Sequence, residues 1–562
     1  MAHALIDQQR SHDHLPHPPW HRPPIILELD LSQPLVDPHP DDPLGPLLNR
    51  GRRQLRPTIK ALHEAAEDPR VVGLVAKVGG SLSWATVHEL HRGLQAFLDA
   101  RKPTIAWAET FPEGSTGTGA YVVASGFDEI WLQPGGSVGL LGVAVETTFL
   151  RGAFDKLGVE PQLGQRYEYK NAADRFTRTE FTDPHRESME ALAASVYADA
   201  VAMIAAGRSL TPERVRELVD TGPRTADEAL AAHLVDRLGY RDEVLGSIRE
   251  RVGDDAVLLF ADRWRPRRRL RLPKRRREHL TLVEIRGGIS AGRSRPGGAM
   301  GGQAGSDTVA SQLRAALEDD RAKGVLLRVD SPGGSAVASE VIWREVCRVK
   351  EAGKPVVVSM GDVAASGGYY VSCPASAIVA LPATLTGSIG VLGGKFVLTG
   401  LLDRVGLSTG AVQQGEHARM WSPRRGFDDG ERNRLDAELD AIYTSFVAKV
   451  AAGRGRTVAE IELLARGRVW TGRDAYDRGL VDELGGLHDA ARTARRLAGL
   501  PADAPLVPAL HVPFFARFGQ PRNSDDPRAQ ASTTLPKSTD LRALVDPMSA
   551  GVQLRMPDIR LR

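Results

Sequence analysis

The sequence predicts an α/β protein built from two tandem copies of one domain, and two observations support this prediction. Helical stretches alternate with short strands rich in Val, Leu and Ile, a pattern typical of a mostly parallel sheet that is buried on both faces. The same order of motifs also occurs twice, at an offset of about 250 residues, far longer than the period of a stacked repeat array. The chain of 562 residues has room for both copies, since domains commonly span about 100–200 residues.

Four pairs of matching segments define the duplication, and they occur in the same order in both copies. The pairs are 68–78 with 319–329, 100–110 with 351–362, 136–142 with 387–393, and 205–239 with 451–485. A preserved order over four segments indicates duplication of a whole domain.

Each copy is expected to begin with the same elements. In the second copy TVASQLRAALEDD predicts an amphipathic helix, GVLLRV a strand, the stretch from Ser335 to Gly353 a helix, and PVVVSM a strand. The first copy repeats this order with RPTIKALHEAAEDPR, VVGLVAKV, TVHELHRGLQAFLDAR and PTIAWAE. Longer helices are expected over 187–207 and 431–453, where apolar residues recur at helical spacing.

These patterns predict five regions along the chain. They are a Pro- and His-rich, partly disordered segment over 1–50, a first repeat over 51–262, an arginine-rich linker over 263–278, a second repeat over 279–500, and a largely disordered tail over 501–562. The tail is rich in Pro, Ser, Asp and Thr, a composition that buries too little apolar surface to fold.

Charge and cysteine content exclude several classes of protein. The 73 Lys and Arg nearly balance the 70 Asp and Glu, so no nucleic-acid partner is expected. Ten of the positive charges lie between Arg263 and Arg277, either as a solvated linker or as a contact for an anionic membrane surface. The 2 cysteines cannot build a disulfide framework or a cysteine-only metal site, and neither a metal nor a cofactor is expected.

Two segments bear on a membrane or metal function. The uncharged run over 363–394 is long enough to cross a bilayer, but its glycines and prolines favour short buried strands joined by tight turns. The N-terminus shows neither a secretory leader nor an anchor, and its five histidines within the first 21 residues fit no standard ligand spacing.

The copies differ in the residues that could carry out chemistry. The second copy contains DSPGGSA from Asp330 and GDVAASGGYYVS from Gly361, and Ser366 in the latter aligns with Thr118 of the first copy. The first copy contains YKNAA with Lys170, where the second copy has alanine at about position 418. Each copy therefore keeps one piece of a candidate pair.

A serine and a lysine together can form a nucleophile and its base. A serine hydroxyl needs a group that takes its proton, and Ser-Lys pairs are an alternative to Ser-His-Asp. Burial of Lys170 where the copies meet would lower its pKa and keep the amine neutral. Gly333, Gly334 and Gly367 have no side chains and would let backbone N–H groups approach an oxyanion.

Three other residues are candidates for a part in the same chemistry. His185 and His417 are the candidates for a Ser-His pair, and His417 is the main rival base because it lies in the segment that matches the lysine segment. Ser388 could orient the lysine, although Ser137 occupies the same place in the first copy.

The set DSPGGS, AASGGYY and TGSIGV in the second copy, with YKNAA in the first, resembles the signal peptide peptidase A (protease IV) family in its long, duplicated form. The resemblance covers roughly residues 54–500. It implies a ClpP/crotonase-like fold in each half and a serine endopeptidase that degrades released signal peptides through an acyl-enzyme. By matching motifs it implies Ser366 as nucleophile, Lys170 as general base, and Gly334 and Gly367 as oxyanion donors.

The resemblance also implies a homotetramer and an association with the membrane. The sequence departs from the family pattern because no N-terminal transmembrane helix is visible, so a peripheral membrane or cytoplasmic location is also consistent with it. The sequence leaves open whether the pair forms within or between protomers. Two other functions stay open at this point, a crotonase-like enzyme for acyl-CoA and a catalytically silent, membrane-associated scaffold.

Overall fold

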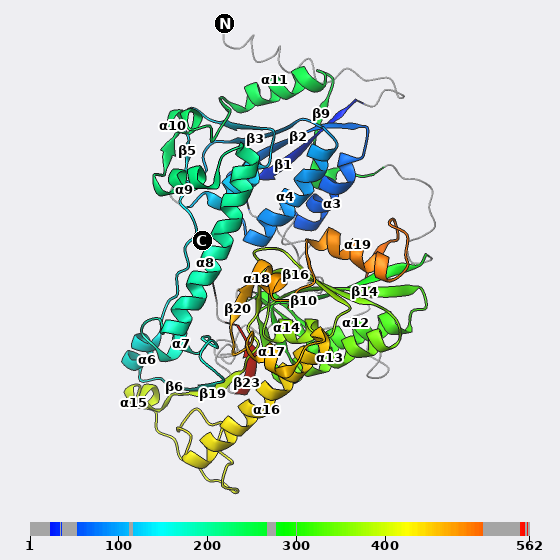
Figure 1. Cartoon of the computed structure of the whole chain (residues 1–562). Coiled ribbons are helices and arrows are strands. Elements are labelled where there is room, and N and C mark those ends of the chain that lie inside the picture. Colours follow the sequence, from blue (N-terminus) through cyan, green and yellow to red (C-terminus); the bar gives the residue numbers. More distant parts are fainter. Residues whose placement is uncertain are drawn as a thin grey trace.

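The computed structural model describes residues 23–33, 35, 53–111, 116–266, 277–298, 301–509, 551–556 and 559. The histidine-rich leader and residues 267–276 of the arginine-rich linker lie outside this part of the chain. Two α/β repeats lie one above the other, the first in the upper part of Figure 1 and the second in the lower part.

The first repeat contains a parallel sheet with the strand order β8-β4-β3-β2-β1-β9. Its strands are β1 (Ile25–Leu31), β2 (Val71–Val78), β3 (Thr104–Ala108), β4 (Glu129–Leu132), β8 (Arg237–Leu238) and β9 (Val257–Phe260). Strand β1 precedes the predicted start of the repeat at residue 51, and it pairs with β2 over its whole length. The sheet therefore begins inside the segment that the sequence predicted as a partly disordered leader.

Helices cover this sheet and lead away from it. They are α3 (Leu55–Ala66), α4 (Trp84–Asp99), α5 (Thr118–Ser125), α6 (Arg151–Leu157), α7 (Asp174–Thr177), α8 (Asp183–Arg208), α9 (Pro212–Asp220), α10 (Ala226–Ala231), α11 (Arg241–Val252) and the 3-10 turn η1 (Ala261–Arg263). The long helix α8 begins where Thr182 accepts a hydrogen bond from the His185 N–H, and it runs from the first repeat down to the level of the second (Figure 1). A short ladder pairs β5 (Ser137–Val138) with β7 (Arg224–Thr225).

The second repeat has the same parallel strand order, β21-β17-β16-β14-β10-β22. Strand β18 also pairs with β16, and β20 pairs antiparallel with β18. Its strands are β10 (His279–Arg286), β14 (Ala322–Ser331), β16 (Val356–Ala365), β17 (Ala377–Ala380), β18 (Leu385–Gly387), β20 (Val469–Thr471), β21 (Glu483–Leu484) and β22 (Leu506–Pro508). Its helices are α12 (Ser306–Glu318), α13 (Ala336–Glu351), α14 (Gly367–Ser372), α15 (Thr399–Arg404), α16 (Asp429–Arg454), α17 (Val458–Glu462), α18 (Gly472–Asp477) and α19 (Leu487–Leu497).

Matching hydrogen bonds support the predicted alignment of the copies. The Tyr121 hydroxyl on α5 donates to the Leu234 carbonyl at 2.6 Å, and the Tyr369 hydroxyl on α14 donates to the Leu480 carbonyl at 2.8 Å. Both rings are fully buried. The alignment that sets Tyr121 opposite Tyr369, and hence Thr118 opposite Ser366, therefore describes equivalent places in the two repeats.

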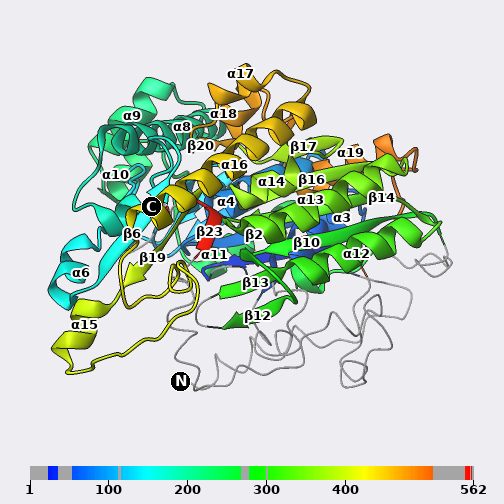
Figure 2. The same ribbon diagram turned by 90° about the horizontal axis from the view of Figure 1, so that it is seen from below.

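A third sheet joins the repeats, with the order β12-β13-β11-β15-β23-β19-β6. Its strands are β6 (Glu160–Gln165), β11 (Gly288–Ser290), β12 (Arg295–Gly298), β13 (Gly301–Gly305), β15 (Gly333–Ser335), β19 (Leu392–Val397) and β23 (Gly551–Arg555). Strand β6 comes from the first repeat and pairs antiparallel with β19 of the second. Seen from below, β6, β19 and the red β23 lie side by side (Figure 2).

The sheets also correct and refine the sequence predictions. Strands β22 and β23 fall in the predicted C-terminal tail, so parts of that tail belong to the folded sheets. The uncharged run over 363–394 forms the end of β16, α14, β17, β18 and the start of β19.

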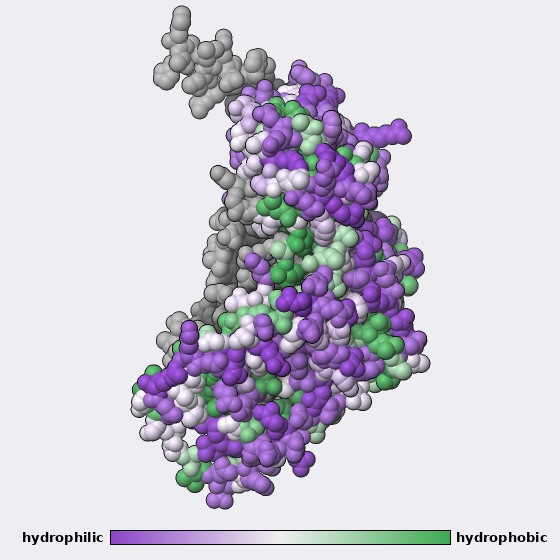
Figure 3. Space-filling model, turned by 60° about the vertical axis from the view of Figure 1, so that its left-hand side comes forward, coloured by the Kyte–Doolittle hydropathy of each residue, from purple (hydrophilic) through white to green (hydrophobic). Residues whose placement is uncertain are grey.

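One helix in the described part of the chain, α8, is long and apolar enough to cross a membrane by length and composition. Its residues Leu192, Val196 and Ile204 are nonetheless buried in the protein. The face drawn in Figure 3 is mostly hydrophilic, and hydrophobic residues gather at its narrowed middle.

Candidate active site

Ser366 lies directly after strand β16 and begins helix α14. Its backbone has φ +55° and ψ −114°, a positive-φ conformation that is strained for a residue with a side chain. The Ser366 N–H donates to the Gly387 carbonyl at 2.8 Å. The next two residues have no room for a side chain. A Cβ on Gly367 would lie 2.7 Å from Ser339 Oγ, and a Cβ on Gly368 would lie 2.6 Å from the Ser331 carbonyl oxygen. The strand-to-helix turn thus fixes the direction of the hydroxyl, as in a nucleophile elbow.

Lys170 comes from the first repeat, in the loop between β6 and α7. The pairing of β6 with β19 brings this loop across to the second repeat. There the loop packs on Gly467, where a Cβ would lie 2.4–2.6 Å from the Lys170 backbone and Cβ. Two hydrogen bonds from the Arg466 guanidinium to Glu168, both 2.9 Å, hold the loop from its exposed side.

The amine of Lys170 and the hydroxyl of Ser366 meet inside one chain. Lys170 Nζ lies 2.8 Å from Ser366 Oγ, 2.9 Å from Ser388 Oγ and 2.9 Å from the Ser388 carbonyl oxygen. All three residues are fully buried. The first distance lies within the 2.6–3.2 Å reach of a base for the proton that it removes.

Burial holds the pKa of Lys170 well below its ordinary value, because the charged ammonium loses its water. A neutral amine has two N–H donors and one lone pair. The Ser388 carbonyl can only accept, and the Ser388 hydroxyl can accept the second N–H. The lone pair is then left for the Ser366 hydroxyl proton, so the three contacts match the hydrogen-bonding groups of a neutral amine.

Glycine backbone lies beside the serine on strand β15. The Gly333 N–H already donates to Ser331 Oγ at 3.2 Å. The next residue, Gly334, has φ +157°, and a Cβ placed on Gly367 would lie 3.2 Å from its nitrogen. The N–H groups of Gly334 and Gly367 are therefore neighbours, and the close packing leaves no room for side chains.

The equivalent place in the first repeat has a different geometry. Thr118 occupies the first turn of α5, and the residue before it has an ordinary negative φ of −94°. Thr118 Oγ1 donates to the Gly142 carbonyl at 2.9 Å and accepts from the Gly142 N–H at 3.1 Å. The hydroxyl is engaged by the backbone of its own repeat and meets no amine in the described structure.

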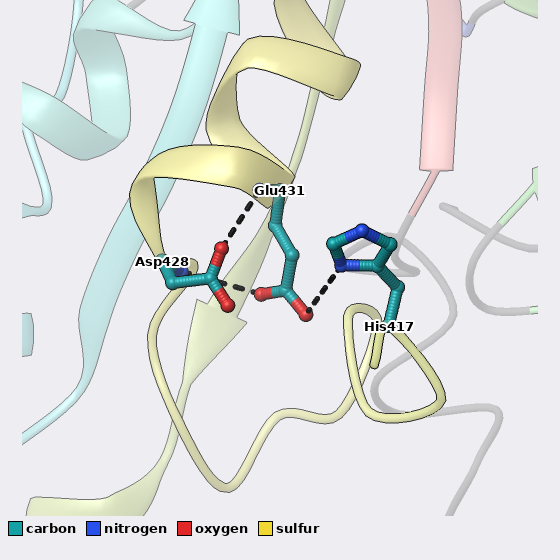
Figure 4. Close-up of side chains that lie close together, drawn as sticks. All are labelled: His417, Asp428 and Glu431. Atoms are coloured by element: carbon teal, nitrogen blue, oxygen red, sulfur yellow. Dashed lines mark hydrogen bonds and ion pairs between the residues drawn. The ribbon is translucent and has the colours of Figure 1, made fainter. Parts of the chain in front are cut away.

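The rival base His417 lies at the N-terminus of α16, in an exposed position (Figure 4). Its Nδ1 lies 4.0 Å from Glu431 Oε1, and His417, Asp428 and Glu431 form a group whose spacing could hold a metal ion. Glu431 already pairs with Arg425 and forms a capping box with Asp428. Asp428 and Glu431 therefore lie together because they cap the N-terminus of α16.

His185 is also engaged elsewhere. It is buried between Phe149 and Phe181, with Nδ1 3.4 Å from Asp174 Oδ2. The atom within reach of Ser366 Oγ in the described structure is the Lys170 amine.

Sequence reasoning missed one position of the candidate site, Gly467, which packs against Lys170. Copy one has Thr221 at the matching place in the segment pair 205–239 and 451–485. A threonine side chain there would overlap the Lys170 backbone, since even a Cβ comes within 2.6 Å of it. The replacement of Thr221 in the first copy by Gly467 in the second is the sequence difference that could have identified this position.

Comparisons with known proteins identify relatives that are peptidases. The model of peptidase family S49 matches residues 96–254 and 348–501, one segment in each repeat. The chain is 32% identical over 458 residues to Protease 4 of Salmonella typhi, which covers 79% of this chain and 72% of that protein. It is 30% identical over 515 residues to the chloroplastic serine protease SPPA of Arabidopsis thaliana, covering 88% of this chain and 73% of that protein.

A solved structure of a ClpP1 mutant from Listeria monocytogenes aligns with 37% of this chain and 94% of its own, with 15% identity and a TM-score of 0.25.

Proposed function

The chain belongs to peptidase family S49 and is a serine peptidase, and from this premise we propose that Ser366 is its nucleophile and Lys170 its general base. Family membership confirms the predicted resemblance to signal peptide peptidase A. The family match in each half and the equal strand orders also confirm the predicted α/β fold built from two tandem repeats. The observation that best supports the proposal is the 2.8 Å separation of Lys170 Nζ from Ser366 Oγ in a fully buried site.

In the first step Ser366 Oγ attacks the carbonyl carbon of the substrate while its proton passes to the neutral Lys170 amine. The carbonyl oxygen gains a negative charge, and the N–H groups of Gly334 and Gly367 donate to it. The glycine backbone of β15 and the turn after Ser366 support this role, because they pack against each other beside the hydroxyl.

In the second step the protonated Lys170 gives its proton to the leaving amine, and the peptide bond breaks to leave an acyl-enzyme on Ser366. Water then attacks the ester while the Lys170 amine takes one of its protons. The protonated amine returns that proton to Ser366 Oγ as the ester bond breaks and the new carboxyl end leaves. Ser388 acts as a positioning residue, since its hydroxyl and carbonyl both lie 2.9 Å from the lysine amine.

The substrates proposed from the family resemblance are hydrophobic peptides such as released signal peptides. Apolar side chains next to Ser366 support this class, because a buried cluster there combines residues of both repeats, namely Met189, Leu192, Ala365, Leu385 and Val469. Assembly into a homotetramer and a membrane contact through Arg263–Arg277 are further parts of the proposal.

Membrane contact is tested with anionic vesicles. Neutralising Arg267, Arg268 and Arg269 is expected to weaken sedimentation with vesicles that contain phosphatidylserine, since each basic residue near such a surface contributes about 1 kcal/mol. Unchanged binding removes the linker from the proposal.

The dyad is tested by matched substitutions in the two repeats. Ser366→Ala and Lys170→Ala are each expected to reduce kcat for a fluorogenic hydrophobic peptide by about 10³-fold or more. The controls are Thr118→Ala, at the place equivalent to Ser366, and Lys156→Ala, at an exposed lysine of the same repeat. Both controls should retain activity within about threefold. Full activity in either dyad variant would reject the assignment.

A further inference from the structure

The loop that carries Lys170, residues 166–170, lies at the surface, while the amine at its end is buried. Tyr167 of this loop is 42% exposed, whereas Lys170 is 0% exposed. Lysine side chains usually keep their amine in water, so burial of this amine favours an outward movement of the loop. Another part of the chain must therefore hold the loop in place.

Arg466, in the segment between α17 and β20, contacts three consecutive residues of the loop. Its guanidinium lies 4.5 Å from the centre of the Tyr167 ring and donates two hydrogen bonds of 2.9 Å to the Glu168 carboxylate. Its backbone carbonyl accepts from the Tyr169 N–H at 3.2 Å. Tyr443 of α16 supports the arginine, since its hydroxyl accepts from the Arg466 N–H at 3.2 Å. Arg466 therefore holds both side chains and backbone of the loop.

Arg468 holds the other side of the loop. Its guanidinium lies 4.9 Å from the centre of the Tyr169 ring, and its Nη1 lies 3.0 Å from Glu187 Oε1 of α8. The Tyr169 hydroxyl donates to the other carboxylate oxygen of Glu187 at 2.6 Å. The Arg468 carbonyl accepts from the Ser388 N–H at 2.7 Å. Arg468 thus connects the loop to Ser388, which contacts the Lys170 amine.

The backbone and the sequence of this contact are both unusual. Tyr167 and Arg466 have positive φ values of +64° and +56°, which are uncommon for residues with a side chain. Strained residues persist where the surrounding contacts hold them firmly, and they cluster at functional sites. The first copy has the sequence DTG from Asp220 where this segment has RGR. The two arginines therefore occur in the repeat that receives the lysine loop.

We propose that Arg466 and Arg468 form an arginine clamp, which holds the lysine loop closed and makes both arginines positioning residues for Lys170. The clamp keeps the amine within reach of Ser366 Oγ and away from solvent. An exposed ion pair alone contributes little, but two parallel hydrogen bonds and ring stacking fix the direction of a contact as well as its distance. The inference rests on the proposed role of Lys170 as general base.

The accessibility of the Lys170 amine tests the clamp without turnover. In the full chain with Ser366→Ala, trace labelling by acetic anhydride is followed for each lysine by peptide mass analysis. Arg466→Ala is expected to raise the labelling rate of Lys170 by about 10-fold or more, towards that of the exposed Lys156, because labelling follows the opened form of the loop. Arg237→Ala, which removes an arginine stacked on a tryptophan of the first repeat, is the matched control and should leave Lys170 protected.

The pH dependence of Ser366 labelling by a fluorophosphonate tests the positioning. In Arg466→Ala the rate should fall by about 10-fold or more, since a displacement of about 1 Å can cost roughly 100-fold. The midpoint of the pH profile should move up towards 10.5, the ordinary value for lysine, because water then reaches the amine. A loss of overall stability alone would leave the midpoint unchanged.

Glu168→Gln gives the same test with a smaller risk to folding. It changes a partly exposed carboxylate and keeps the shape of the side chain, and it should move the midpoint in the same direction. Equal labelling of Lys170 in the presence and absence of Arg466, or an unchanged midpoint in a folded Arg466→Ala variant, overturns the clamp. If Arg466→Ala does not fold, an unchanged midpoint in Glu168→Gln overturns it.

These results separate the clamp from the proposed dyad. If Lys170→Ala retains full peptidase activity, the dyad fails, and the protection of the Lys170 amine by Arg466 is still measurable by acetic anhydride. If Lys170→Ala and Ser366→Ala are inactive while Arg466→Ala leaves Lys170 protected, the clamp fails and the dyad stands.

Discussion

The two repeats have one architecture but differ in the residues at the candidate active site. Their parallel sheets have the same strand order, and the buried tyrosines Tyr121 and Tyr369 make equivalent hydrogen bonds. Thr118 and Ser366 also occupy equivalent places. The Thr118 hydroxyl makes its hydrogen bonds with the backbone of Gly142 in its own repeat, whereas Ser366 has a strained backbone and its hydroxyl faces the Lys170 amine. The comparison indicates that the scaffold alone does not produce the site.

For the lysine, the first repeat supplies the candidate residue and the second repeat lacks it. The first repeat sends β6 and Lys170 into the second repeat, while the matching segment of the second repeat, around Ala418, is exposed and forms no such strand in the described structure. Gly467 receives the lysine loop where the first repeat has Thr221. Each repeat has thus kept what the other lacks, and the β6–β19 pairing brings the pieces together.

The largest effect outside the dyad is expected from Gly467→Ala. The new Cβ would lie 2.4 Å from the Lys170 nitrogen, at a residue with φ +88°, so the lysine loop must shift. A displacement of about 1 Å can cost roughly 100-fold in rate, and kcat should fall by about that factor. Gly246→Ala, where nothing lies within 4 Å, is the control. Full activity in a folded Gly467→Ala variant would show that the loop does not need this contact.

A smaller effect is expected from Ser388→Ala. It removes one of the polar groups around the Lys170 amine and leaves the Ser388 carbonyl in place. The loss of one hydrogen bond of about 1–1.5 kcal/mol predicts a drop in kcat/KM of about tenfold. Ser137→Ala, at the same place in the first repeat, should change kcat/KM by less than twofold. Equal effects of the two substitutions would remove Ser388 from the site.

The smallest effect is on stability and appears only as a function of pH. Burial holds the pKa of Lys170 below its ordinary value. An unfolded lysine has a pKa of about 10.4. Between these two pKa values the unfolded chain therefore binds more protons than the folded chain. The free energy of unfolding should therefore rise with pH across this window. Lys170→Met lacks this dependence, and the stability of wild type relative to the variant should increase from pH 8 to pH 10 in urea melts. Parallel pH profiles would mean that the lysine is not desolvated.

Much of the fold could be predicted from the sequence because apolar strand runs and duplicated motifs depend on local patterns. VVGLVAKV and GVLLRV form the predicted strands β2 and β14, and the long helices predicted from residues 187 and 431 are α8 and α16, each a few residues longer at its N-terminus. Strand β1 was missed because the prolines around it indicated a leader. Strand β23 was missed because its pairing depends on tertiary contacts with β15 and β19, which no local pattern of Gly551–Arg555 reveals.

The candidate site was predictable in part. The comparison of the copies selected Ser366 and Lys170, and their side chains meet in the structure. The sequence could not indicate that both come from one chain, since this follows from the β6–β19 pairing across repeats. It also could not predict the fit of Gly467 against Lys170, because that contact joins residues almost 300 positions apart.

The rate at which a fluorophosphonate labels Ser366, measured against pH by peptide mass analysis, tests most directly whether a neutral lysine activates this serine. The account predicts a rate that rises with pH to a midpoint well below 10.5, the ordinary value for lysine, and labelling at least 100-fold slower in Lys170→Ala. A midpoint at the ordinary lysine pKa, or equal labelling of wild type and Lys170→Ala, would contradict it.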